Sequence, residues 1–173
     1  MRLVDNIHLV GGGAWGGMGL SPGPDCNVYL VDCGSELVLI DCGSGAAGSV
    51  DAILANIVAD GLSPDRIGTI LLTHKHGDHV GGAAQFAERT GAVLRASAET
   101  AAVLATADED AASIGAAKQA GLYAKDFVLA PVGSVQTLAG GEHFGIGDVD
   151  FEVIETPGHC SGHLSFVVRR GER

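Results

Sequence analysis

Apolar and polar residues follow one another along this chain in short stretches, most of them with the period of β-strands. The stretch at residues 67–73 is almost continuously apolar, which indicates a strand covered on both of its faces. Residues 26–32 and 36–41 predict a hairpin that turns at residues 33–35. Further strands are expected at residues 3–10, 92–96, 151–155 and 164–169, with short strands and turns between 131 and 150.

Three other stretches have the spacing of helices. In residues 49–59 the apolar positions recur three and four apart, so that one face of the predicted helix is apolar. Helices are also expected at residues 80–90 and at 98–123, the second with a break near 108–110. Strands therefore alternate with helices and hairpins, and no repeat or low-complexity linker divides the chain. We expect a single domain over residues 1–173, of a mixed α/β class with covered sheets.

The composition fits one folded domain and excludes several kinds of partner. Hydrophobic residues make up 46% of the 173 residues, which is enough for a sizeable core. The net charge of −11 leaves no broad basic face, so nucleic acid is excluded as a partner. No apolar run approaches the roughly 20 residues that span a bilayer, and the first residues carry no secretory signal. We therefore expect no membrane partner and a cytoplasmic protein, in which the four irregularly spaced cysteines are free thiols.

A glycine-rich segment at residues 11–19 follows the first predicted strand. Its glycines match the GxGxxG pattern, but Pro22 and Pro24 stand where the helix of a dinucleotide site has to begin. We therefore reject a dinucleotide site and interpret the segment as a mobile loop. Trp15 is its one large apolar side chain and a candidate to lie over a substrate, the alternative being an ordinary surface loop.

Five of the seven histidines fall in two short segments. In the first, His74 and His76 follow an apolar strand two residues apart, so their rings project to one side and can chelate one Zn²⁺ at about 2.0–2.1 Å. Gly77 allows a sharp turn, after which Asp78 and His79 offer a carboxylate and an imidazole to a second cation. Four ligands in one short segment do not easily share one tetrahedron, which favours two adjacent metals.

The second segment supplies a third imidazole. Pro157 and Gly158 form a rigid corner after a predicted strand and present His159 at the edge of a sheet. With the first segment, His159 gives the three histidines of a catalytic zinc site that keeps one position open. His163 is a candidate for a position beside the ligands or on the surface, and Cys160 for a small buried group or a soft ligand.

These motifs resemble those of the metallo-β-lactamase superfamily. Its HxHxDH signature stands at residues 74–79, and its TPGH corner stands at 156–159. Residues 39–43, Leu-Ile-Asp-Cys-Gly, are similar to an early motif of the family. Residues 161–163, Ser-Gly-His, are most similar to the glyoxalase II branch, the hydroxyacylglutathione hydrolases. The resemblance runs along the whole chain in the order of the family.

The resemblance implies an αββα sandwich, an α+β arrangement with the metals at one edge of its two sheets. It implies that His74, His76 and His159 bind the first metal, and that Asp78 and His79 begin the second site. Zinc is the expected metal at both sites, with iron or manganese as alternatives. In hydrolytic members a metal-bound hydroxide attacks the substrate, and Asp78 is the expected catalytic residue because it orients that water or accepts its proton.

The chain departs from the family after the second motif. Members of the family carry a later aspartate that bridges the metals and a final histidine for the second metal. Residues 160–173 contain no aspartate and no histidine other than His163. We expect a sandwich that is incomplete at its C-terminal end because the chain is a fragment of a longer gene product. Completion by another subunit and a reduced site with one metal are the alternatives. Such an unclosed sheet edge favours a homo-oligomer.

Three functions follow from these motifs. The first is a metal-dependent hydrolase of a small thioester, ester or amide, similar to the hydroxyacylglutathione hydrolases. The second is a mononuclear iron oxidoreductase like the persulfide dioxygenases of the same framework, because two histidines and a carboxylate suit oxygen chemistry on iron. The third is a non-catalytic metal-binding or assembly module, which the missing ligands favour. In each enzyme the partner is a small molecule, and the sequence does not define which one.

Overall fold

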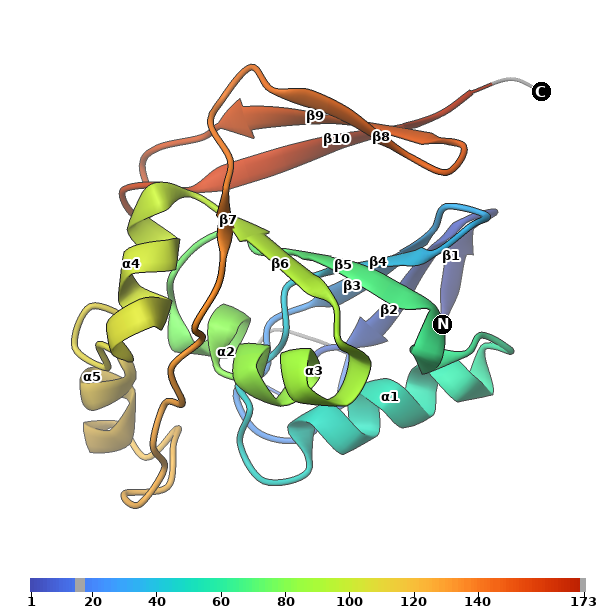
Figure 1. Ribbon diagram of the computed structural model, residues 1–173. Helices are drawn as coiled ribbons and strands as arrows, with labels where there is room; N and C mark the ends of the chain where they lie inside the picture. The colour runs from blue at the N-terminus through green and yellow to red at the C-terminus, as the bar shows by residue number, and fades with distance from the viewer. Residues whose placement is uncertain (15–17, 172–173) are drawn as a thin grey trace.

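The computed structural model describes residues 1–14 and 18–171 of the chain, which fold into two sheets (Figure 1). Trp15 lies outside the described residues. The larger sheet contains, in spatial order, β1 (Arg2–Val4), β2 (Ile7–Gly11), β3 (Val28–Asp32), β4 (Leu37–Ile40), β5 (Ile67–Leu71), β6 (Val93–Ala96) and β7 (Gln136–Thr137). The smaller sheet contains, in spatial order, β10 (Leu164–Arg170), β9 (Val149–Glu155) and β8 (His143–Ile146).

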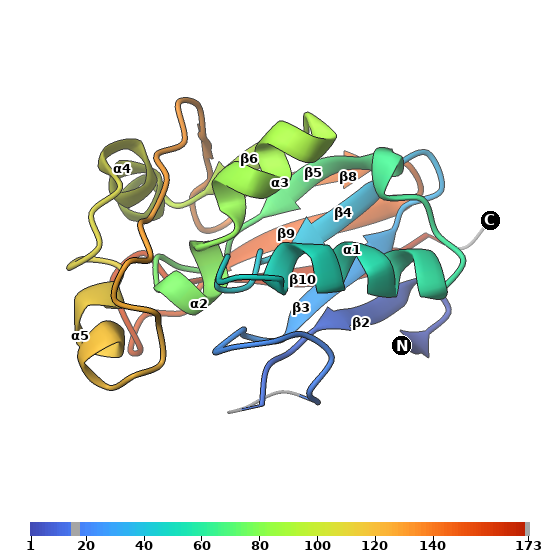
Figure 2. The same ribbon diagram turned by 90° about the horizontal axis from the view of Figure 1, so that it is seen from below.

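The helices of the described residues are α1 (Ser49–Ala59), α2 (Gly77–Val80), α3 (Ala83–Thr90), α4 (Ala98–Thr106) and α5 (Ile114–Gln119), with a 3₁₀ helix at Pro64–Arg66. Helices α1 and α3 lie against one face of the larger sheet, and the smaller sheet lies over its other face (Figures 1 and 2). This arrangement confirms the expected class and three layers of the αββα sandwich. Within the described part of the chain, no helix covers the outer face of the smaller sheet (Figure 1). None of the described helices is long and apolar enough to cross a membrane.

The direction of the strands brings two chain segments to one edge of the larger sheet. Strands β1 to β4 are antiparallel neighbours, whereas β4 to β7 are parallel neighbours. Parallel neighbours need a crossover connection, which α1 provides between β4 and β5, and α2 with α3 between β5 and β6. The carboxyl ends of β4 and β5 therefore lie side by side, and Asp41 and Thr73 follow them closely in the sequence.

The larger sheet is buried on both faces. Leu39 and Ile70 pack in the apolar core beneath α1 and α3. Their neighbours Val38 and Leu71 point the other way and pack against Phe151 of the smaller sheet. Alternate residues of β4 and β5 therefore enter two different cores, which explains the continuous apolar run in this part of the sequence.

The single strand expected at residues 3–10 is divided in the structure. It forms β1 and β2, which pair antiparallel across a turn at Asp5 and Asn6. Aspartate and asparagine favour turns because their side chains bond to the nearby backbone. The local turn chemistry therefore overrides the apolar pattern on either side of it.

The helix expected at residues 80–90 has a different start and an interruption. Helix α2 already begins at Gly77, and two glycines separate it from α3. A Cβ atom at Gly81, the first of these glycines, would lie 1.9 Å from the carbonyl oxygen of Ser44. The close approach of these two backbones permits only glycine at this position.

Candidate metal centre

The predicted ligands meet at the edge where β4 and β5 end. His74 and His76 lie on the loop after β5, and Asp78 and His79 lie on α2. His159 lies on the connection between β9 and β10 of the smaller sheet. The centre is therefore assembled from the two sheets together.

Three imidazoles form the inner part of the centre. His74, His76 and His159 each offer one nitrogen, and these three atoms lie within 4.8 Å of one another. Nδ1 of His76 and Nε2 of His159 are 2.9 Å apart. Nε2 of His74 is buried and has no hydrogen-bond partner among the described residues, which calls for a ligand that is absent from the polypeptide. The donor set fits a divalent cation such as zinc with one position left open, and the binding of metal by these residues stays a prediction.

The imidazoles of the buried His74 and the half-buried His76 are held in the form that binds metals. Burial, together with the neighbouring His79 and His76, lowers the pKa of His74 to about 2. Burial and the nearby His159 also lower the pKa of His76. Both rings are therefore neutral near pH 7, and neutral imidazole is the ligand form of histidine.

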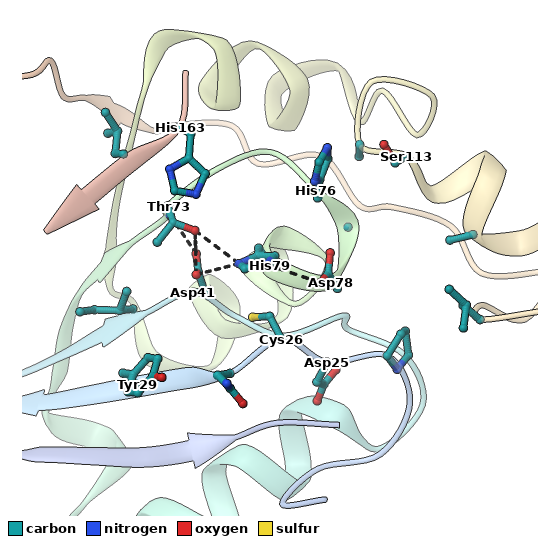
Figure 3. Close-up of a pocket in the computed structure, with 18 of the residues that line it drawn as sticks. Asp25, Cys26, Tyr29, Asp41, Thr73, His76, Asp78, His79, Ser113 and His163 are labelled. Carbon is teal, nitrogen blue, oxygen red and sulfur yellow. Dashed lines mark hydrogen bonds and ion pairs between the residues drawn. The ribbon is translucent and has the colours of Figure 1, made fainter. Parts of the chain in front are cut away.

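Asp41 decides which nitrogen of His74 faces the cluster. Its carboxylate accepts hydrogen bonds from the backbone N–H and from the hydroxyl of Thr73, each over 2.8 Å (Figure 3). The hydroxyl has only one proton to donate, so Oγ1 of Thr73 accepts the hydrogen bond from Nδ1 of His74, 3.0 Å away. Nε2 of His74 is then unprotonated, and its lone pair is available to a cation.

The same carboxylate orients His79. Nδ1 of His79 donates to Oδ2 of Asp41 over 2.8 Å (Figure 3). Burial by itself lowers the pKa of His79, but the hydrogen bond to Asp41 and the charges of Asp41 and Asp78 outweigh it and raise the pKa. Nε2 of His79 is left free and lies 3.5 Å from Oδ2 of Asp78. Asp78 and His79 thus present an oxygen and a nitrogen side by side, and their binding of a second metal stays a prediction.

Asp41 is a functional candidate to which the sequence motif assigns no role. It is only 3% exposed, and its φ of 63° is a left-handed conformation that residues other than glycine adopt at a cost. The signal in the sequence is an aspartate placed directly after an apolar strand that ends in glycine-rich chain. Its role depends on partners 32 and 38 positions away, which local spacing does not reveal.

His163 lies beside the three imidazoles without contributing to the group of three nitrogens. Its ring stacks on that of His74 with 4.8 Å between the centroids, and its Nδ1 forms a hydrogen bond of 2.8 Å with Oγ1 of Thr156. Cys160 is half-buried and does not line the cavity at the centre. The expected supporting roles of His163 and Cys160 stay predictions, and that of Trp15 lies outside the described residues.

A cavity of about 810 Å³ adjoins the centre (Figure 3). His76, Asp78 and His79 all line it. None of the described lining residues is a lysine or an arginine. Eight further lining residues are apolar or aromatic: Tyr29, Ile40, Leu164 and Phe166 from the two sheets, and Ala112, Ala117, Leu122 and Tyr123 from the region of α5.

Comparison with known proteins gives matches along most of the chain. A family model described as the metallo-beta-lactamase superfamily matches residues 22–172. A hydroxyacylglutathione hydrolase of Methylococcus capsulatus is 32% identical over 131 residues, which make up 75% of this chain and 41% of that protein. An atrochrysone carboxyl ACP thioesterase of Aspergillus fumigatus is 27% identical over 146 residues, which make up 84% of this chain and 37% of that protein.

The fold also matches solved structures. A subclass B3 metallo-β-lactamase of Bradyrhizobium japonicum superposes with a TM-score of 0.75 at 26% identity. The match covers 100% of this chain and 57% of that chain. The present chain thus spans about two fifths of the length of the curated relatives and little more than half of the solved one.

Proposed function

Because this chain belongs to the metallo-β-lactamase superfamily, we propose that it supplies the metal centre of a hydrolase that cleaves a small thioester, ester or amide. The observation that carries the proposal is the convergence of His74, His76 and His159, with Nε2 of His74 buried and unpartnered among the described residues. Three imidazoles suit zinc, so we expect Zn²⁺ at this cluster and a second zinc ion beside Asp78 and His79. A divalent cation bound there lowers the pKa of water towards about 7 and polarises the substrate oxygen.

Asp78 is the residue that we expect to handle the proton of the attacking water. Its side chain is 40% exposed, lines the cavity and lies next to His79. A carboxylate in this position accepts a hydrogen bond from the water, which turns an oxygen lone pair towards the substrate carbonyl. It can then take up the proton as the new bond between oxygen and carbon forms.

The cavity favours an uncharged acyl group as the part of the substrate next to the metals. Its walls are largely apolar, and its described lining offers no lysine or arginine to pair with a phosphate. Among acyl compounds we favour thioesters, because the printed names of two relatives concern them. Hydroxyacylglutathione is a glutathione thioester, and the second relative is a thioesterase.

The proposal is tested with a panel of thioesters, esters and amides offered to the purified chain after loading with Zn²⁺. We expect turnover of at least one thioester, and we expect His74→Ala to lose both this turnover and bound zinc. His143→Ala is the matched control, because His143 is an exposed histidine on β8 outside the cluster. Full zinc occupancy without turnover on any substrate contradicts the hydrolase and favours the binding module. Oxygen uptake with glutathione persulfide by the iron-loaded chain favours the dioxygenase instead.

A further inference from the structure

The thiol of Cys26 lies at the centre and has no part in the mechanism above. Cys26 lies on the segment between β2 and β3 and lines the cavity (Figure 3). Its backbone N–H donates to the carbonyl oxygen of Asp78 over 3.2 Å. This hydrogen bond fastens the segment to α2, which carries Asp78 and His79, so the thiol is held next to the second pair of predicted ligands.

Three different donor atoms meet at this place. Sγ of Cys26, a carboxylate oxygen of Asp41 and a ring nitrogen of His79 lie within 4.8 Å of one another. Figure 3 shows the three side chains together, with Asp78 on the far side of the His79 ring. A sulfur, an oxygen and a nitrogen at such separations are close enough to share one cation after small side-chain movements.

The surroundings of the Cys26 thiol differ from those of the other cysteines. Sγ of Cys33 donates to the carbonyl oxygen of Val31, and Cys42 is fully buried in the core beneath α1. Sγ of Cys26 has a hydrogen bond with the backbone of Gly43 and lies beside Asp41 and Asp78. Among the described cysteines, Cys26 is the one that lines the cavity. Its place in the cavity lining therefore distinguishes Cys26 from the other described cysteines.

The charges around Cys26 favour a cation. Asp41 and Asp78 both place negative charge near the thiol, and no lysine or arginine lies among the described residues of the cavity lining. A zinc ion reverses this balance, because its charge stabilises the thiolate and the carboxylates at once. A thiolate combined with an imidazole selects zinc over magnesium, calcium or manganese.

We propose that Cys26 is a ligand of the second zinc ion, which it binds together with His79 and beside the carboxylates of Asp41 and Asp78. The S–H proton passes to solvent as the bond between zinc and sulfur forms. The signature at residues 74–79 contains no cysteine, so this ligand is contributed by a different part of the chain. The inference rests on the metal binding of the proposed function and is independent of the reaction catalysed.

Cobalt(II) tests the inference, because a thiolate bound to it produces a sulfur-to-cobalt charge-transfer absorption in the near ultraviolet. We expect the metal-free chain to develop this band on titration with Co²⁺, and Cys26→Ser to lose it while still binding cobalt at the three imidazoles. Cys160→Ser is the matched control and is expected to keep the band. Cobalt binding by the wild-type chain without the band overturns the inference, and so does a band of full strength in Cys26→Ser.

Two further measurements separate this inference from the proposed function. In His74→Ala we expect the band to persist, because the second site keeps Cys26 and His79. In the wild-type chain we expect Zn²⁺ to protect Cys26 from alkylation by iodoacetamide, followed by mass spectrometry, and this readout does not depend on any variant folding. Equal alkylation with and without zinc overturns the inference. Failure of hydrolysis with the band present contradicts only the proposed function.

Discussion

Nδ1 of His76 and Nε2 of His159 lie 2.9 Å apart, although 83 positions separate the two residues in the chain. His76 follows the larger sheet, and His159 belongs to the smaller one. An apolar core that includes Leu71 and Phe151 holds the two sheets together. The three-imidazole cluster therefore exists only while the sheets are packed, which couples metal binding to folding.

Zinc is expected to stabilise the folded chain through this coupling. At a free concentration of about 100 times the dissociation constant, a ligand that binds only the folded state raises the free energy of unfolding by about 2.7 kcal/mol. We expect His159→Ala to lose most of this increase with little change in the metal-free stability, because His159 is exposed. Urea unfolding with and without zinc measures both quantities, and His143→Ala serves as the control. An undiminished zinc effect in His159→Ala contradicts a three-imidazole site.

Asp41→Asn is expected to weaken zinc binding without a change in the ligands themselves. An amide cannot accept from both Thr73 and His79 as the carboxylate does, so the control over the ring tautomers is lost. Loss of such a supporting contact typically reduces metal affinity about 10–100-fold. Competition with a chromophoric chelator measures the affinity. Asp32→Asn, which alters an aspartate paired with Arg66 at the other end of the sheet, should leave it unchanged. A folded Asp41→Asn chain with wild-type affinity refutes the positioning role.

Phe151→Ala is expected to destabilise the packing of the two sheets. Phe151 is 1% exposed and lies in the core between them. Truncation of a buried phenylalanine to alanine costs about 3–5 kcal/mol of the free energy of unfolding. The midpoint of urea unfolding, measured on the metal-free chain, reports this loss. Val128→Ala is the control, because Val128 is 76% exposed, and a similar loss in both variants contradicts the assignment of this core.

Glu109 makes the stability of the region around α5 depend on pH. Hydrogen bonds from Lys118 and from the backbone N–H of Leu129 lower the pKa of Glu109 below its ordinary value. A carboxyl group whose pKa is lowered by folding stabilises the fold above its unfolded pKa, and this contribution disappears as the pH falls through the lowered value. Glu109→Gln is therefore expected to destabilise the chain at neutral pH and to make no difference at strongly acid pH.

Urea unfolding between about pH 7 and pH 3 measures this difference. Glu88→Gln is the matched control, because Glu88 is exposed on α3 and has no ion pair among the described residues. A gap between wild type and Glu109→Gln that stays constant over this range contradicts the assignment, as does an equal gap for Glu88→Gln.

Much of the fold is predictable from local patterns. The hairpin of β3 and β4, helix α1 and the apolar strand β5 all lie where the periodicity of the sequence places them. The undivided strand predicted at residues 3–10 and the uninterrupted helix predicted at residues 80–90 are both wrong for the same reason. The features that interrupt them are not part of the periodic pattern of apolar residues. The turn at Asp5 and Asn6 agrees with the general preference of these two residue types for turns. The break before α3 lies where Gly81 closely approaches Ser44, 37 positions earlier in the chain.

The sequence by itself determined the candidate ligands and the family, because the signature at residues 74–79 is a local spacing and needs no knowledge of distant contacts. Only the tertiary structure decided that His159 joins His74 and His76, and that the thiol of Cys26 lies close to His79. It also decided that Asp41 fixes the free nitrogen of His74 through Thr73. These relationships join residues on different strands and sheets. They are set by strand order and by the packing of two apolar cores, which no single stretch of sequence specifies.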